Sequence, residues 1–261
     1  MAKKNLDKVC YRDTYLKDVI LRVDFAAPSQ KLEKKIPAKL TKAATKRFPI
    51  SDIQTVHSQE FQVSPTGLSA NAREEVQHIF YGKEREKNIV IAQQHMVMAN
   101  QAYSSFEDLT ADFFSIFDVL SGVDQEIVAN RIGLRYINVI EFPDGDPLDW
   151  SDYICESLLG VVGFNGRKSN LSRVFHVVEY NFGEIYLKCQ FGIANPDYPA
   201  LIKRRQFILD IDAYSAGAYE PNEITRVVAD AHALIQEFFE ASIKDPVRKL
   251  MGQAKNESKA K

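Results

Sequence analysis

The chain has 261 residues, 45% of them hydrophobic and 26% charged, and a formal net charge of −2. These values are typical of a soluble globular protein that buries a sizeable core, in one large or two small domains. The charge excludes a global attraction to nucleic acid or anionic membranes, so either role would need a local basic patch. Cys10, Cys155 and Cys189 are odd in number and far apart, which indicates neither a zinc site nor a disulfide framework.

Targeting segments and motif-borne chemistry are also not indicated. No apolar run approaches the ~20 residues of a membrane span, and the N-terminal stretch lacks the apolar core of a signal peptide. We therefore expect a cytoplasmic protein without membrane contact. The sequence contains no GxxxxGK[ST], GxGxxG, HExxH or GxSxG motif, and no two histidines have metal-ligand spacing. No cofactor and no metal are therefore predicted.

The first half of the chain predicts a strand, a helix, four strands and a second helix. In the first helix the apolar residues recur at near-helical spacing, Pro37 suits the first turn and Pro49 closes the helix. The predicted strands are 18–25, 53–63, 76–81, 88–93 and 95–100, and the predicted helices are 31–48 and 103–120.

The second half predicts the same order with one strand fewer. It starts at the long strand 131–142, in which apolar side chains alternate with a mixed face. A helix at 150–162, with Asp149 or Ser151 as its cap, should follow. The remaining predictions are strands 172–182, 184–192 and 203–215, a helix at 220–243, and a disordered tail at 253–261.

These elements predict an α+β fold. Two similar β-α-β(3–4)-α halves, 1–125 and 126–252, would form one curved antiparallel sheet with helices on one face. The order of elements is also that of helix-grip and TATA-binding-protein-like folds, an analogy that carries no function.

The predicted first helix is the strongest concentration of charge. Residues 31–47 hold seven positive residues against Glu33, a net charge of +6. This face is either a solvated surface or a contact for phosphate or an acidic protein surface. A surface that binds single-stranded nucleic acid needs aromatic residues among its positive charges, and none lie among these lysines. The candidate binding residues are Lys35, Lys39, Lys42 and Lys46.

A second basic set lies in or beside the loops of the second half. Loops at one end of a sheet often converge, so these residues could form a phosphate-binding patch, or they could be separately solvated. They are Arg167, Lys168, Arg173, Lys203, Arg204 and Arg205.

Two arginines of the strand 131–142 are further candidates. Arg131 and Arg135 share the mixed face with Gly133, whose backbone is bare. Arg135 could pair with a carboxylate on a neighbouring strand, or the face could line a groove for an anionic ligand. Asp24, at the end of the first strand, could form a structural pair with Arg22 or Arg135.

The best polar cluster for catalysis is Asp210, Asp212 and His232. The two aspartates are two residues apart on one strand and share a face, and His232 lies in the following helix. A carboxylate beside an imidazole can act as a general base, or it can be a buried link that fixes the helix on the sheet. No nucleophile or metal ligand accompanies them.

Three segments together resemble one bacterial family: VANRIGLRYINVIEF at 128–142, QFILDIDAY at 206–214 and HALIQEFFEASIKDPVRKLMG at 232–252. With the strand at 19–25 the resemblance covers nearly the whole chain. The family consists of sporadically distributed proteins of about this length that are not linked to a particular activity. The resemblance therefore implies a bacterial setting and brings no catalytic residues. Its patchy distribution hints at toxin–antitoxin or phage-defence contexts.

Three functional hypotheses remain. The first is a non-enzymatic cytoplasmic binding protein that acts on a protein partner, or on a second copy of itself, through its sheet groove or basic helix. The second is a nucleic-acid-binding protein that uses residues 31–47 and the basic loops at 167–205, whose binding would weaken steeply with salt. The third is an enzyme that uses the Asp210, Asp212 and His232 cluster.

Overall fold

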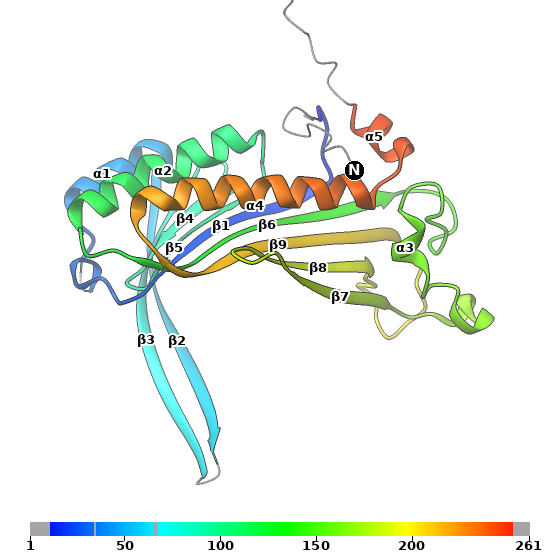
Figure 1. Cartoon of the computed structure of the whole chain (residues 1–261), viewed down its shortest axis with the longest axis horizontal. Coiled ribbons are helices and arrows are strands. Elements are labelled where there is room, and N and C mark those ends of the chain that lie inside the picture. Colours follow the sequence, from blue (N-terminus) through cyan, green and yellow to red (C-terminus); the bar gives the residue numbers. More distant parts are fainter. Residues whose placement is uncertain (1–10, 34, 65–66, 253–261) are drawn as a thin grey trace, which may run out of the picture. The chain divides into compact units, whose positions relative to one another are not determined.

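The computed structural model describes residues 11–33, 35–64 and 67–252 (Figure 1). The strands in this part of the chain are β1 Leu16–Phe25, β2 Ile50–Ser64, β3 Gly67–Tyr81, β4 Lys87–Ile91, β5 His95–Asn100, β6 Ala129–Phe142, β7 Val174–Asn181, β8 Tyr186–Ile193 and β9 Arg205–Tyr219. The α-helices are α1 Ala38–Arg47, α2 Phe106–Val123, α3 Glu156–Leu159, α4 Pro221–Ser242 and α5 Asp245–Met251. Short 3-10 helices are η1 Gln30–Leu32, η2 Phe164–Gly166 and η3 Lys168–Asn170.

The strands form one nine-stranded antiparallel sheet in the order β2-β3-β4-β5-β1-β6-β9-β8-β7. The predicted α+β class is therefore confirmed. The described chain divides into two compact units. Unit 2 comprises residues 20–132 and 216–225, and unit 1 comprises residues 11–19, 133–215 and 226–252. The predicted halves 1–125 and 126–252 stay a prediction.

The core of unit 2 follows from strict alternation along its strands. Ile89 and Ile91 of β4 lie opposite Met98 and Met96 of β5, and all four side chains are fully buried. Helices α1 and α2 pack against each other, and α2 contacts β5. The hydroxyl of Ser105 caps α2 by accepting a hydrogen bond from the backbone N–H of Asp108. A single buried carboxylate ties the helices to the sheet, because Asp112 of α2 pairs with Arg47 of α1 at 2.5 Å and with Lys87 of β4 at 2.7 Å.

Helix α1 is shorter than predicted. The sequence predicts a helix from residue 31, whereas α1 begins at Ala38 and residues 30–32 form η1. Pro37 lies at the N-cap with an extended backbone (ψ 138°) rather than inside the first turn. A proline disfavours the helical conformation at the residue before it, so a helix cannot run through Ile36 into Pro37.

Strands β2 and β3 form a hairpin that is much longer than predicted. Each strand has 15 residues, paired from Ile50↔Tyr81 to Ser64↔Gly67. Strand β3 pairs with β4 only between His78 and Tyr81. Residues 54–64 and 67–77, called the β2–β3 arm below, therefore extend past β4 as a two-stranded ribbon, with Ile53 at its base (cyan in Figure 1).

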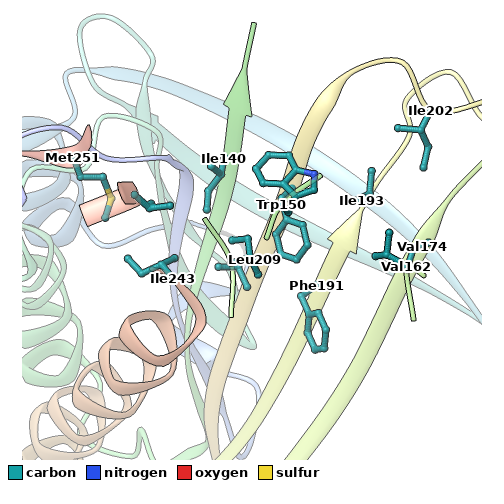
Figure 2. Close-up of a cluster of buried hydrophobic side chains, with 13 residues drawn as sticks. Ile140, Trp150, Val162, Val174, Phe191, Ile193, Ile202, Leu209, Ile243 and Met251 are labelled. Carbon is teal, nitrogen blue, oxygen red and sulfur yellow. The ribbon is translucent and has the colours of Figure 1, made fainter. Parts of the chain in front are cut away.

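Unit 1 has its own hydrophobic core around Trp150, Phe207 and Leu209 (Figure 2). Strands β7, β8 and β9 and the segment after β6 all contribute side chains to it. Close packing of β8 on β7 requires the glycine at position 192. Its φ is +140°, and a Cβ there would lie 2.2 Å from the carbonyl oxygen of Val174.

The predicted helix at 150–162 is wrong. The segment consists of turns, and only Glu156–Leu159 is α-helical. The backbone N–H of Lys244 donates to the carbonyl of Tyr153, and that of Cys155 donates to the carbonyl of Ser242, each at 2.8 Å. Ile154 and Ile243 thereby form an isolated β-bridge. The backbone groups of Tyr153 and Cys155 are hydrogen-bonded to the chain after α4, so they are not available for the hydrogen bonds of a helix.

The C-terminal part of unit 1 contains one more helix than predicted. Helix α4 ends at Ser242, and α5 follows at Asp245–Met251, with Pro246 in its first turn. The predicted disordered tail at 253–261 lies outside the described residues. None of the helices in the described part of the chain is long and apolar enough to span a membrane.

Candidate functional site

A polar pocket of about 350 Å³ lies within unit 2. It is lined by Arg22, Asp24, Phe25, Gln94, His95, Asn130 and Arg131. Among the residues singled out from the sequence, the pocket brings together Arg131, Arg22 and Asp24. His95 is a new member.

Strand alternation places the charged side chains of the pocket. In β1 the apolar Leu21 and Val23 are fully buried, so Arg22 and Asp24 lie on the opposite face. The backbone around the pocket is fixed by hydrogen bonds. Phe25 donates its N–H to the carbonyl of Gln94 at 2.7 Å, which holds the end of β1 beside the turn before β5. His95 is the first residue of β5 and is buried.

The charged groups of the pocket meet at one carboxylate. Arg22 donates from Nε and Nη2 to Oδ1 of Asp24, at 2.8 and 2.6 Å. Nη1 of Arg131 lies 3.7 Å from Oδ2 of the same aspartate, which is an ion pair but too long for a hydrogen bond. The Arg22–Asp24 pair predicted from the sequence is therefore present. Arg131 adds a second guanidinium.

His95 is held in its neutral form. Burial lowers the pKa of His95 below its usual 6.5, and the positive charge of Arg22 lowers it further. The carboxylates of Glu75 and Asp24 oppose this effect in part, and Oε1 of Glu75 lies 3.8 Å from Nδ1 of His95.

The lining combines charged and amide side chains. It contains no hydroxyl, thiol or amine. In the described part of the chain no group of three or more His, Cys, Asp or Glu residues could hold a metal ion. The chemistry that the lining offers is electrostatic and hydrogen-bonding contact with a negatively charged group.

Arg135 occupies a closed site in unit 1. It donates from Nε to Oδ1 of Asp210 at 2.7 Å and from Nη2 to Oδ2 at 2.5 Å. The amide of Gln190 donates to Oδ2 of the same aspartate at 3.2 Å. Of the two interpretations of Arg135, the structural pair with a neighbouring strand is the one observed.

The predicted catalytic cluster does not form. Asp210 contacts Arg135 and Gln190, whereas Nδ1 of His232 lies 3.1 Å from the hydroxyl of Tyr136. Arg135 and Tyr136 are consecutive in β6, so their side chains lie on opposite faces of the sheet. His232 is therefore on the other face from Asp210. Asp212 contributes negative charge near Arg135 instead.

The basic surface of α1 and the segment before it is exposed. The predicted residues Lys35, Lys39, Lys42 and Lys46 all face solvent. No ion pair or hydrogen bond joins the side chain of any of these four lysines to the described residues. Arg47, by contrast, is held by Asp112. A chain of lysines is thus available for an acidic partner.

Most of the basic loop residues in unit 1 already have partners. Lys168 lies 3.6 Å from Asp146, Arg204 lies 3.5 Å from Asp197, and Arg173 lies over the ring of Tyr198. Arg167 also makes an interaction, and Lys203 is exposed. Five of the six residues thus have local contacts and Lys203 is exposed, which favours the interpretation as separate solvated or paired cations.

The side chain of Arg205, the sixth residue of the basic set, is engaged within unit 1. Its guanidinium donates to the carbonyls of Asp144 at 3.0 Å and Asp149 at 2.7 Å. It also lies over the rings of Phe142, Trp150 and Tyr153, about 5 Å from each centroid. Arg205 therefore fixes the turn that follows β6.

Comparison with known proteins adds no relative. No protein-family model matches the chain, and a search of curated proteins finds no match. The resemblance to the sporadically distributed bacterial family stays a prediction.

Proposed function

We propose that this chain is a non-enzymatic binding protein that engages a protein partner through its β2–β3 arm. The observation that carries the proposal is the arm itself. Over residues 51–57 of β2 every residue is exposed, and Ile53 and Val56 are 65% and 39% exposed. The two side chains lie on opposite faces of the ribbon, so apolar surface faces solvent on both sides.

An unsupported ribbon of this kind needs a partner. A two-stranded hairpin alone is marginally stable in water, because neither face is packed against a core. A second protein that covers Ile53 and Val56 would supply the missing apolar burial. The partner surface would therefore be apolar where it contacts the base of the arm.

The other two hypotheses have less support. The acid–base cluster is split between two faces of the sheet, and most of the basic loop residues are engaged. The lysines of the α1 region remain as a single basic surface for nucleic acid. A place in a defence or toxin–antitoxin module stays a prediction from the family resemblance.

The proposal is tested by shortening the arm. Residues 57–74 are replaced by Asn-Gly, which joins the paired residues Val56 and Glu75 by a two-residue hairpin turn. The double variant Ile53→Lys with Val56→Lys leaves the arm at full length. The matched control is Leu250→Lys, which changes an exposed apolar residue of α5 in unit 1.

Purified full-length chain is examined by light scattering, and co-purifying proteins are identified after affinity capture from bacterial cells. We expect self-association, or the retention of one defined protein, in the wild type and in Leu250→Lys. Both arm variants should lose it. Association that survives in both arm variants would contradict the proposal. A wild-type chain that is always monomeric and retains no other protein would also contradict it. An excess of absorbance at 260 nm that is lost when high salt releases bound nucleic acid would favour the nucleic-acid hypothesis instead.

A further inference from the structure

We propose that the partner of the β2–β3 arm is a second copy of this chain, and that the two copies pair edge to edge along β2. The inference rests on the proposed function, because it names the partner of the same surface. It is carried by the position of β2 in the sheet, by the composition of its free edge and by a register in which the strand complements itself.

Strand β2 has one side of its backbone free. It is the outermost strand of the sheet, and no loop or helix in the described part of the chain makes a backbone hydrogen bond to it. In an antiparallel strand, alternate residues direct both their N–H and their C=O to the same side. The N–H of Ile53 donates to the carboxylate of Asp52 at 2.9 Å, so Ile53 belongs to the outward set. Ser51, Thr55 and His57 have the same parity and also direct their backbone groups outward.

The composition of this edge leaves it open to pairing. Charged residues and prolines on an edge strand discourage pairing with another chain. The arm has a second free edge along residues 67–77 of β3, but that edge carries three charged residues in succession at 73–75. Strand β2 contains no proline, lysine or arginine, and its two acidic residues, Asp52 and Glu60, are far apart. Of the two edges of the arm, β2 is therefore the less protected one.

A second copy of β2 fits this edge about a twofold axis at His57, the middle residue of the strand. Antiparallel pairing about this axis places residues 50–56 of one copy opposite residues 64–58 of the other, so all 15 residues are paired. An axis at any other residue would leave one end of the strand unpaired. The two arms would then form a four-stranded sheet in the order β3-β2-β2-β3, in place of two hairpins that are each marginally stable.

The same register is favourable for charge. It places Asp52 of one copy opposite Gln62 of the other, and Glu60 opposite Gln54. Like charges directly opposite each other on paired strands are destabilising, and this register contains no such pair. Because the interface is isologous, the one edge supplies both halves of the contact. The self-complementary register is what favours a second copy over an unrelated strand.

The experiment measures mass and backbone protection on the purified full chain. Light scattering over a dilution series should give the mass of a dimer for the wild type at high concentration. Hydrogen exchange followed by NMR then reports single amides, with the double lysine variant of the arm as the monomeric reference. The outward amides of Ser51, Thr55 and His57 should exchange about tenfold more slowly in the dimer, because they gain a hydrogen bond across the edge. The inward amides of Asp52 and Gln54 already bond to β3 and should not differ.

Thr55→Pro tests the backbone of the edge directly. Proline removes one outward N–H and places its ring in the path of an approaching strand, but an edge strand tolerates it where the N–H faces solvent. We expect this variant to keep the arm and to be monomeric. The matched control is Val177→Lys, which changes a 54% exposed valine of β7, the strand at the other end of the sheet. It should remain dimeric. The arm-shortened variant lacks residues 58–64, which are all the partners of 50–56, and should be monomeric.

The outcomes separate this proposal from the proposed function. A monomeric wild type that retains a different protein through the arm would overturn pairing of two copies and leave the proposed function standing. A dimer that is lost in both arm variants but persists in Thr55→Pro, with outward amides that exchange as in the monomer, would have the same meaning. A dimer that Val177→Lys abolishes would place the contact on β7 and overturn this proposal. Association that survives in both arm variants would overturn both proposals.

Discussion

Two clusters in this protein are built from the same residue types and behave differently. In unit 1, Arg135 uses two nitrogens to bind both oxygens of Asp210, and Gln190 donates a further hydrogen bond. In unit 2, Arg22 directs two nitrogens at a single oxygen of Asp24, and a second arginine stands 3.7 Å from the other. One carboxylate is bound by a single bidentate arginine, and the other is shared by two arginines.

The difference teaches that the same residue types can be joined by different geometries. A bidentate arginine–carboxylate pair satisfies both partners. At Asp24 two arginines share one carboxylate, and only Arg22 is within hydrogen-bond distance of it. Burial separates the two clusters as well, since the side chain of Asp210 is 8% exposed and that of Asp24 is 20% exposed.

The largest expected effect comes from breaking the Arg135–Asp210 cluster. Arg135→Ala leaves the buried carboxylate of Asp210 without a counter-charge, so we expect the free energy of unfolding to fall by about 3 kcal/mol. Urea denaturation measures it. Arg226→Ala is the matched control, because Arg226 pairs with the exposed carboxylates of Glu184 and Asp230. The urea midpoint of this variant should hardly differ from that of the wild type. Equal losses in the two variants would contradict the structural role of Arg135.

A smaller loss of stability is expected at the Asp24 cluster. Asp24→Asn removes the charged acceptor of Arg22 but keeps its size, and Arg22 can turn to solvent because its side chain is 42% exposed. We expect a loss of about 1.5 kcal/mol in urea denaturation, in the range for a hydrogen bond to a charged group. Asp210→Asn provides the comparison and should cost more. If Asp24→Asn cost as much as Asp210→Asn, the Asp24 cluster would be structural too.

Sequence patterns predicted most of the elements of this fold, because those elements depend on local periodicity. The strand at 95–100 has the predicted bounds, and each end of α4 lies within one residue of its predicted position. The helix predicted at 150–162 failed because its apolar residues have helical spacing, while its backbone is bound by residues 242–244. That competition is between distant segments and leaves no local signal.

The candidate site was predictable only in part for the same reason. The R-x-D spacing of Arg22 and Asp24 places both on one strand face, and this much is local. Their meeting with Arg131 and His95 depends on which strands are neighbours in the sheet and on where the turn before β5 lies. Asp210 and His232 lie in consecutive elements of the chain, but their side chains lie on opposite faces of the sheet. The sequence pattern did not specify which face His232 would contact.

The smallest effect, and the one that best separates the clusters, concerns pH. Burial lowers the pKa of His95 below its unfolded value of 6.5, whereas the Arg135 cluster holds no histidine. Below pH 6.5 the unfolded chain binds a proton that the native His95 does not, so stability falls as the pH falls until the native pKa is passed. His95→Gln should flatten this part of a curve of unfolding free energy against pH. His57→Gln, at an exposed position of β2, should leave the curve unchanged. An acid-side slope that is equal in the wild type and in His95→Gln would mean that burial of His95 has no effect on stability, and the two clusters would then not differ in their response to pH.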